Sequence, residues 1–405
     1  MSFVSEFNRL PLASLLEQAV TATISDVSRV LAEGARTLGD FAILLSPAAE
    51  GLLERLCRNS QSLTRQRFGK VIRLYAPLYL SNECINNCAY CGFSRDNAIL
   101  RVTLSLEQVA AEAEALAAQG FRNVLLVAGE HPKFVSNGYM AACVARLSQS
   151  IPSLSLEVGP METADYIPLV EAGAEGLVVY QETYDRRVYA SMHTAGPKRD
   201  FDWRLETPER AYAAGFRRLG IAALYGLAAW RYEALCTAAH AQFLLRECWK
   251  AQLTISFPRL RPCAGDFQPL TLLGDRQLVQ LMAAFRLLLP DAGLVLSTRE
   301  TARFRDGLFP LGITHASAGS HTEPGGYTGA GKEDLHHTVR GRIVALEAGS
   351  IQPGLSGRRA TNATGQFEIA DDRTPAEVAE AIRGMGYEPV WKDWDSAITA
   401  PVLAA

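Results

Sequence analysis

The feature that most constrains the fold is a regular alternation of short β-branched runs with longer helical patterns between residues 71 and 317. Eight runs have the length and composition of buried strands. They are Val71–Leu80, Asn123–Ala128, Leu154–Val158, Gly176–Tyr180, Arg218–Ala223, Leu253–Phe257, Gly293–Ser297 and Gly312–His315. Strands that alternate with helices favour parallel pairing through right-handed crossovers. Eight such units predict an α/β protein of the closed (β/α)8 TIM-barrel type.

An open, doubly wound sheet is the alternative, since it uses the same local pattern of strands and helices. That fold often carries a G-x-G-x-x-G turn after its first strand, and no such turn follows residue 80 here. Gly329-Ala330-Gly331-Lys332 is not a P-loop either, because it has the wrong spacing and no following Ser or Thr. The barrel is therefore the favoured prediction.

Three regions differ in pattern along the chain. The first carries apolar residues at helical spacing between breaker residues, and the second holds the eight runs. The third begins where the composition shifts towards Gly, Pro, Ser, Thr and Arg. The predicted boundaries are 1–70 for the helical region, 71–320 for the barrel and 321–405 for a C-terminal region.

The C-terminal region is predicted to contain a loop over residues 323–366, followed by a docking tail. In the tail, Thr374-Pro375 is typical of a helix start, and Tyr387–Trp394 is typical of a strand or docking segment. His336 and His337 could indicate a metal pair, but adjacent side chains point apart. A solvated loop is therefore predicted at these two histidines.

Charge and hydropathy exclude several classes of function. The 405 residues include 40 Lys and Arg against 43 Asp and Glu, so no basic excess indicates a nucleic-acid partner. No apolar run approaches the roughly 18–20 residues that span a membrane. The N-terminus lacks the basic and apolar regions of a secretory signal, so we expect a cytoplasmic protein without a membrane partner.

Three of the eight cysteines, Cys84, Cys88 and Cys91, lie within eight residues directly after the first predicted strand. Thiolates bind iron–sulfur clusters and zinc, but a closed zinc site needs four ligands and no fourth is near in sequence. Three thiolates on a four-iron cluster leave one iron open for a cofactor or substrate. The remaining cysteines are expected to be inert core thiols; they are Cys57, Cys143, Cys236, Cys248 and Cys263.

The cysteine spacing, its place after the first strand, and Tyr90 before the last cysteine together resemble the radical S-adenosylmethionine (SAM) superfamily. A zinc-stabilised interaction protein is the non-enzymatic alternative. Catalytic groups of a barrel gather at the carboxyl ends of its strands, and many of these ends carry charge. They are Gly129-Glu130, Glu157, Tyr180-Gln181-Glu182, Tyr225, Arg259 with Arg261, Arg299-Glu300 and Ser317. Such a ring suits a zwitterionic cofactor and substrate, because charges buried without partners are costly.

A closer resemblance rests on the segments LYLSNECINNCAYCGFSRDN, LLVAGEHP, VVYQETYD, DFDWRLETPERA, SFPRLRPC, LSTRE, EPGGY and PVWKDWD. They resemble the radical SAM tyrosine lyases, the 2-iminoacetate synthase (ThiH) family of thiamine biosynthesis, over about residues 70–330 and 370–396. The segment 330–366 is longer than the family pattern requires. The resemblance implies cleavage of the Cα–Cβ bond of L-tyrosine to 2-iminoacetate and p-cresol. It also implies a flavodoxin or ferredoxin type of one-electron reductant, and a thiazole synthase partner that receives the product.

The resemblance also implies how the cofactors are held. The three clustered cysteines would ligate a 4Fe–4S cluster, whose open iron is chelated by the SAM amine and carboxylate. Gly129 and Glu130 take the position of the superfamily's SAM-amine motif. Glu182 would bind the ribose hydroxyls, with Glu157 a weaker candidate, and Arg204 would bind the SAM carboxylate.

For the substrate, the resemblance implies that Arg299 and Ser317 bind the carboxylate of the amino acid and that Tyr79 lines the space beside the cofactor. The hydrogen atom is then expected to leave from the substrate amine. Two related reactions remain as alternatives. One is a lyase acting on tryptophan. The other is the tyrosine lyase of hydrogenase assembly, which needs a second cluster on C-terminal cysteines, whereas no cysteine follows Cys263.

Overall fold

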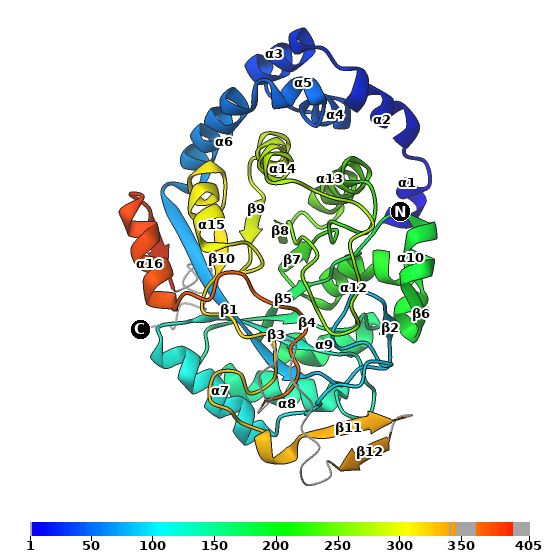
Figure 1. The fold of residues 1–405 in the computed structure, drawn as a ribbon, viewed down its shortest axis with the longest axis vertical. Helices are drawn as coiled ribbons and strands as arrows, with labels where there is room; N and C mark the ends of the chain where they lie inside the picture. Colours follow the sequence, from blue (N-terminus) through cyan, green and yellow to red (C-terminus); the bar gives the residue numbers. More distant parts are fainter. Residues whose placement is uncertain (1, 340–341, 346–361, 392–405) are drawn as a thin grey trace, which may run out of the picture.

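The computed structural model describes residues 2–339, 342–345 and 362–391. Eight parallel strands form the centre of the molecule (Figure 1). They are β1 Val71–Ser81, β3 Asn123–Ala128, β4 Ser153–Glu157, β5 Ala174–Val178, β7 Arg218–Ile221, β8 Gln252–Ser256, β9 Gly293–Leu296 and β10 His315–Ser317. Their order follows the chain, and β10 pairs back onto β1 through Leu74 and Ala316. The sheet is thus closed, which confirms the predicted (β/α)8 barrel.

The eighth strand differs from its prediction by three residues at its start. The expected run began at Gly312, whereas β10 begins at His315. A 3-10 turn, Phe309–Leu311, precedes it, and Gly312 continues the turn with a φ of 154°. Ser317 consequently belongs to the strand itself and pairs with Tyr75 of β1.

Helices cover the outside of the barrel between the strands. They are α7 Leu106–Ala118, α8 Asn137–Leu147, α9 Thr163–Glu171, α10 Arg186–Met192, α11 Phe201–Leu205, α12 Thr207–Ala214, α13 Trp230–Glu247, α14 Asp275–Leu288 and α15 Ala302–Leu308. The first of them starts at a capping box, in which Gln108 N–H donates to the Ser105 hydroxyl at 3.2 Å and Ser105 N–H donates to Gln108 Oε1 at 2.8 Å. No described helix is long and apolar enough to cross a membrane.

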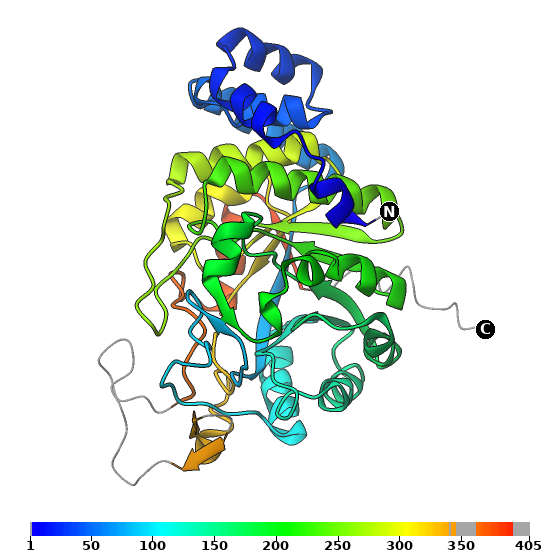
Figure 2. The same cartoon turned by 90° about the vertical axis from the view of Figure 1, so that its right-hand side faces the viewer.

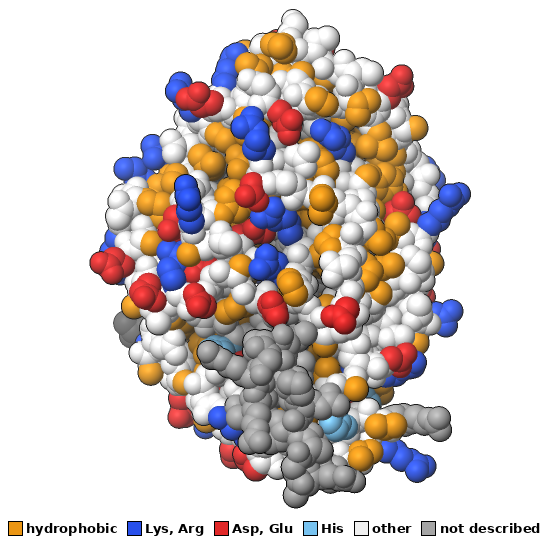
Figure 3. All heavy atoms as spheres, viewed as in Figure 1, with side chains coloured by type: hydrophobic (Ala, Val, Ile, Leu, Met, Phe, Trp, Pro, Cys, Tyr) orange, Lys and Arg blue, Asp and Glu red, His pale blue; other side chains and the backbone are white. Residues whose placement is uncertain are grey.

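The N-terminal helices form a separate layer packed on α13 and α14 (Figure 2). They are α1 Phe3–Phe7, α2 Leu12–Thr21, α3 Ile24–Glu33, α4 Leu38–Leu44, α5 Pro47–Glu50 and α6 Leu53–Phe68. Aromatic contacts hold the layer in place: Phe41 meets Phe285 edge-on at 4.8 Å, and Phe3 stacks on His240 at 4.2 Å. On the face shown in Figure 3, acidic and basic side chains are interspersed.

The tail after residue 374 contains α16 Pro375–Gly384 and β13 Glu388–Val390. The short strand extends the sheet by pairing with the start of β1, and Trp391 meets Phe121 edge-on at 5.1 Å. Trp394, which belongs to the same predicted segment, lies outside the described residues. The tail is thereby fixed to the amino-terminal end of β1.

The predicted loop 323–366 contains structure that the sequence did not indicate. Strands β11 His336–Val339 and β12 Arg342–Ala345 form an antiparallel hairpin, after the short 3-10 turn Lys332–Asp334. The prediction of a solvated His336 is wrong. Its backbone pairs with Arg101, and its Nε2 lies 2.8 Å from Glu83 Oε1 in a buried contact. Residues 346–361 of this segment lie outside the described residues.

Candidate active site

The cysteine loop that follows β1 is held in shape by buried polar groups. Arg101 is fully buried, and its guanidinium donates hydrogen bonds to the carbonyls of Asn82 at 2.6 Å and Ser94 at 2.8 Å. Beside the loop, the short strands β2 (Asn87–Cys88) and β6 (His193–Ala195) pair with each other. The loop conformation is therefore set by contacts within the protein.

The thiols of Cys84, Cys88 and Cys91 border one cavity of about 610 Å³ at the carboxyl end of the barrel. Burial raises the pKa of Cys91 to about 11 and also raises that of Cys88, so thiolates here need a cationic partner. Among the described residues, no three His, Cys, Asp or Glu side chains converge closely enough to hold a single metal ion. Three thiols around a shared space suit a polynuclear cluster better than one zinc ion.

Gly129 allows the end of β3 to pass directly under the cysteine loop. A Cβ at this position would overlap the carbonyl oxygen of Glu83 and lie 3.2 Å from the Cβ of Cys84. The Gly129 N–H donates to the Ser81 carbonyl at 3.0 Å, which fixes this approach. The next residue, Glu130, accepts a hydrogen bond from Asn86 at 2.6 Å. The predicted amine-binding segment thus forms the floor beneath the cysteines.

Glu182 forms the polar wall of the same cavity, with two basic side chains beside it. Its carboxylate accepts a hydrogen bond from Lys198 Nζ at 2.6 Å and lies 3.4 Å from Arg204 Nη2. Burial alone would raise the pKa of Glu182, but these two cations hold it below its ordinary value. Glu182 also has a φ of 72°, a conformation that few residues other than glycine adopt. All the residues predicted to bind cluster and cofactor line this cavity.

A second cavity of about 480 Å³ adjoins the first and brings together the residues predicted for the substrate. Tyr79, Arg299 and Ser317 line it. The guanidinium carbon of Arg299 lies 3.4 Å from the centroid of the Phe367 ring, so the planar group stacks on an aromatic face. The two cavities share a wall formed by Val127, Glu157, Tyr180 and Gln366.

Other polar residues at the strand ends lie outside both cavities. The charge of Arg259 is neutralised by Glu300 through paired hydrogen bonds, and by Asp275 at 2.8 Å. Arg261 and Tyr225 line neither cavity, and the Tyr225 hydroxyl is buried. Of the polar residues that the sequence places at the strand ends, only some therefore line the two cavities.

Three residues of the site carried no sequence signal. Lys198 lies in the 3-10 turn Pro197–Arg199 rather than at a strand end. Gln366 and Phe367 belong to the C-terminal region, and Gln366 accepts a hydrogen bond from the Tyr79 hydroxyl at 2.8 Å. Backbone hydrogen bonds hold Gln366 and Phe367 at the cavity: Gly92 N–H donates to the Gln366 carbonyl at 3.0 Å, and Gln366 N–H donates to the Thr322 carbonyl at 2.9 Å.

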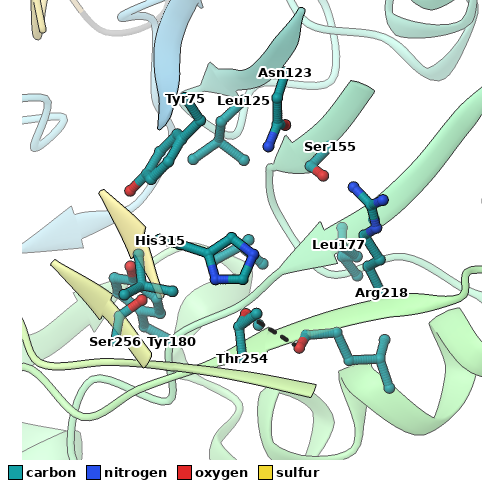
Figure 4. A pocket seen from close by; sticks show the side chains of 15 residues that line it. Tyr75, Asn123, Leu125, Ser155, Leu177, Tyr180, Arg218, Thr254, Ser256 and His315 are labelled. Atoms are coloured by element: carbon teal, nitrogen blue, oxygen red, sulfur yellow. Dashed lines mark hydrogen bonds between the residues drawn. The ribbon is translucent and has the colours of Figure 1, made fainter. Parts of the chain in front are cut away.

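The barrel lumen continues below the second cavity as a further cavity of about 610 Å³ (Figure 4). Tyr75, Leu125 and Tyr180 line both spaces. Small residues such as Ser155 and Thr254 stand deeper in the lumen, where barrels usually carry bulky branched side chains. The candidate active site is thus the upper end of a partly hollow barrel.

Comparison with known proteins agrees with this geometry. Residues 78–235 match the Radical SAM superfamily, and residues 256–388 match the Biotin and Thiamin Synthesis associated domain. The 2-iminoacetate synthase of Escherichia coli strain K12 is 44% identical over 375 residues, covering 92% of each chain. The chain belongs to the 2-iminoacetate synthase family of radical SAM enzymes. The synthase of Salmonella typhimurium strain LT2 is 42% identical over the same share.

Solved structures place this family member among similar barrels. The [FeFe]-hydrogenase maturase HydG superposes with a TM-score of 0.82 at 29% identity, covering 96% of this chain and 81% of that chain. Methylornithine synthase (PylB) shares the fold, with a TM-score of 0.67 at 19% identity and coverage of 90% and 97%. Membership of the radical SAM superfamily implies a 4Fe–4S cluster and SAM. It sets aside the alternative of a zinc-stabilised interaction protein.

Proposed function

We propose that this enzyme cleaves the Cα–Cβ bond of L-tyrosine to 2-iminoacetate and p-cresol, for the thiazole moiety of thiamine. One observation carries the proposal: a cavity bordered by three cysteines opens into a second cavity that presents a guanidinium and a hydroxyl. The first suits a cluster with its cofactor, and the second suits the carboxylate of an amino acid. The family relationship supplies the reaction class.

Cys84, Cys88 and Cys91 would hold the 4Fe–4S cluster. SAM would lie beside it, against the residues predicted for its amine, ribose and carboxylate; these are Gly129, Glu130, Glu182 and Arg204. Glu157, the weaker candidate for the ribose, lies on the wall that this cavity shares with the second one. When bound and reduced, this pair supplies the one-electron chemistry that removes a hydrogen atom from the substrate. The protein supplies position, charge and exclusion of water.

The substrate carboxylate would lie against Arg299 and Ser317. A guanidinium binds a carboxylate through two parallel hydrogen bonds, which fixes both the position and the rotation of the amino acid. No carboxylate of the described residues forms an ion pair with Arg299, so its guanidinium can bind the substrate carboxylate. Tyr79 closes the space between substrate and cofactor, its ring edge-on to Phe93 at 5.8 Å.

The chemistry also indicates partners. An external one-electron donor of flavodoxin or ferredoxin type would reduce the cluster. Because 2-iminoacetate is an imine that hydrolyses readily, direct transfer to a thiazole synthase protein follows as the productive route. We expect the reaction to take place in the cytoplasm, without nucleic-acid or membrane partners.

The proposal is tested by anaerobic reconstitution followed by reaction with SAM, dithionite and L-tyrosine. We expect about four irons per chain, and p-cresol formed together with 5′-deoxyadenosine. L-Tryptophan in place of tyrosine should give no cleavage product. An enzyme that cleaves tryptophan and leaves tyrosine intact would contradict the proposed substrate.

Cysteine variants test the cluster separately. Cys88→Ala should lose both the cluster and SAM cleavage, because two thiolates hold a four-iron cluster poorly. Cys263→Ala is the matched control: this buried thiol is hydrogen-bonded to the Tyr90 carbonyl at 3.3 Å and lines neither cavity. Iron content of the purified variants is the measurement. Cluster loss in Cys263→Ala would show that a ligand has been assigned wrongly.

A further inference from the structure

The wall of the second cavity carries one negative and one positive side chain. Of its described lining residues, Glu157 is the only carboxylic acid and Arg299 the only basic side chain. Glu157 ends β4, and Arg299 follows β9. In the closed order of eight strands, β4 and β9 are four strands apart in either direction. The two charges therefore face the cavity from opposite sides of the barrel mouth.

Glu157 differs from the other carboxylates near the site because no residue in the described part of the chain forms a hydrogen bond with its carboxylate. Glu130, Glu182 and Glu300 each accept hydrogen bonds from an amide or a cation. Among the described residues, none donates a hydrogen bond to the Glu157 carboxylate or forms an ion pair with it. A half-buried carboxylate without a partner is costly, unless a ligand supplies the missing donor. The accessible surface of Glu157 lies in the space that the ligand would fill.

We infer that Glu157 binds the α-ammonium group of the substrate amino acid and accepts a proton from it. This inference rests on the proposed function, since it requires an amino acid whose carboxylate lies at Arg299. A zwitterion placed between the two residues would have each charge opposite its complement. Ribose hydroxyls, the other candidate partner for Glu157, are neutral and already have Glu182 on the cofactor side.

The surroundings of Glu157 suit it to this proton transfer. Burial, and then the negative charge of Glu182, raise the pKa of Glu157 to about 7. The titratable and charged groups that face Glu157 are Glu182, Arg299, Lys198, Arg204, Tyr75, Tyr79 and Tyr180. The ammonium group of a free amino acid has a pKa above the roughly 7.7–8.0 of a peptide N-terminus, because its neighbour is a carboxylate rather than an amide. A carboxylate with a pKa of about 7 is therefore a better proton acceptor for it than an ordinary Glu at about 4.3.

The step itself is a simple transfer. One N–H bond of the ammonium breaks, its electron pair stays on nitrogen, and an O–H bond forms on the Glu157 carboxylate. The resulting amine is neutral. Removal of a hydrogen atom from a neutral amine leaves no positive charge on an electron-deficient nitrogen, whereas removal from ammonium would. Glu157 thus prepares the substrate in the form that the reaction uses.

The experiment compares Glu157→Gln with the wild-type enzyme, both loaded with cluster and SAM. Equilibrium binding is measured for L-tyrosine and for 3-(4-hydroxyphenyl)propanoate, which lacks the ammonium group. We expect the variant to bind tyrosine at least about 10-fold more weakly and the propanoate equally well. The kcat/KM for tyrosine should fall by about 10²–10⁴-fold. We expect the wild-type rate to fall below about pH 7, and this loss should disappear in the variant. Glu157→Asp should keep that pH dependence, with a lower rate.

Folding and cofactor binding are followed in the same variants. Iron content, SAM affinity and melting temperature should match those of wild type and of Glu171→Gln, a substitution on the exposed end of α9. If Glu157→Gln weakens SAM binding and leaves tyrosine affinity unchanged, Glu157 belongs to the cofactor and the inference is overturned. Retention of the acid-side rate loss near pH 7 would overturn it as well. Wild-type enzyme that neither binds nor cleaves tyrosine would contradict the proposed function itself.

Discussion

Arg259, Arg261 and Arg299 all follow strands at the same end of the barrel, yet only one of them faces the substrate cavity. Arg259 forms ion pairs with Glu300 and Asp275, which neutralise its charge within the protein. Arg299 instead stacks on Phe367 and lies 3.5 Å from the Arg259 carbonyl through Nη1. The sequence indicates that a guanidinium is available but does not say which of the three reaches the substrate cavity, since this depends on contacts between distant strands.

Substitution of Arg299 tests the carboxylate site. Removing one partner of a buried charge pair costs about 2–5 kcal/mol, so Arg299→Ala should lower kcat/KM for tyrosine by about 30-fold to several thousand-fold. Lys should restore only part of this, because it lacks the planar fork. The measurement is p-cresol formation against tyrosine concentration. Cluster content and SAM cleavage without substrate should persist, and Arg303→Ala on the exposed face of α15 should behave as wild type. Wild-type kinetics in Arg299→Ala would place the carboxylate elsewhere.

At the scale of elements, the site depends on the close approach of the end of β3 to the cysteine loop. Gly129 makes that approach possible, because any side chain there would meet the backbone of Glu83. The obstructing atom is a carbonyl oxygen rather than the end of a flexible side chain, so the loop itself would have to move. Such a shift would displace Cys84, the next residue along the loop.

Gly129→Ala should therefore reduce iron content and SAM cleavage together, and lower the melting temperature. A matched control is Gly138→Ala in the first turn of α8, where the added Cβ would come no closer than 4.0 Å to the Ser136 hydroxyl. That variant should keep its iron and be as stable as wild type or slightly more so, because Ala favours helix by up to about 1 kcal/mol over Gly. Normal iron content in Gly129→Ala would show that the loop tolerates displacement.

The sequence predicted those elements well whose formation follows from local periodicity. It predicted poorly those elements whose formation depends on contacts with distant parts of the chain. The eight strands were found because they are short β-branched runs between longer helical patterns, and the three cysteines because their spacing is local. The hairpin of β11 and β12 was missed because its Gly- and Arg-rich surroundings are typical of loops. His336 is buried through contacts with Glu83 and Arg101, some 235–255 residues earlier, and no local pattern records such contacts.

At the scale of the whole molecule, the C-terminal region packs on the barrel and forms part of the substrate cavity. Gln366 and Phe367 line the substrate cavity, and the segment that follows them is anchored by Asp371. Asp371 is buried and forms an ion pair with the fully buried Arg305 of α15. Arg305 also donates a hydrogen bond to the carbonyl of Ser317, at the end of β10. One buried arginine thus connects the C-terminal segment to the strand that presents the predicted substrate hydroxyl.

Breaking this connection should destabilise the protein and disturb the site together. Asp371→Asn leaves Arg305 without its buried counter-charge, a loss that typically costs about 3–5 kcal/mol. We expect a lower melting temperature and a raised KM for tyrosine, with iron content retained. Asp372→Asn, at the neighbouring exposed position, should change neither. Equal melting temperatures for the two variants would show that the ion pair contributes nothing to stability.

The pH dependence of stability gives an independent check on the same pair. Burial alone would raise the pKa of Asp371, but hydrogen bonds from Arg373 and the charge of Arg305 hold it below its ordinary value of 3.8. A carboxyl whose pKa is lower in the folded state stabilises that state fully above its unfolded pKa, and this contribution is lost as the pH falls through the folded value. Wild type should therefore lose melting temperature more steeply than Asp371→Asn as the pH falls below about 4. Because the amide cannot titrate, parallel curves for the two proteins would mean that Asp371 is not the group whose protonation releases the C-terminal segment.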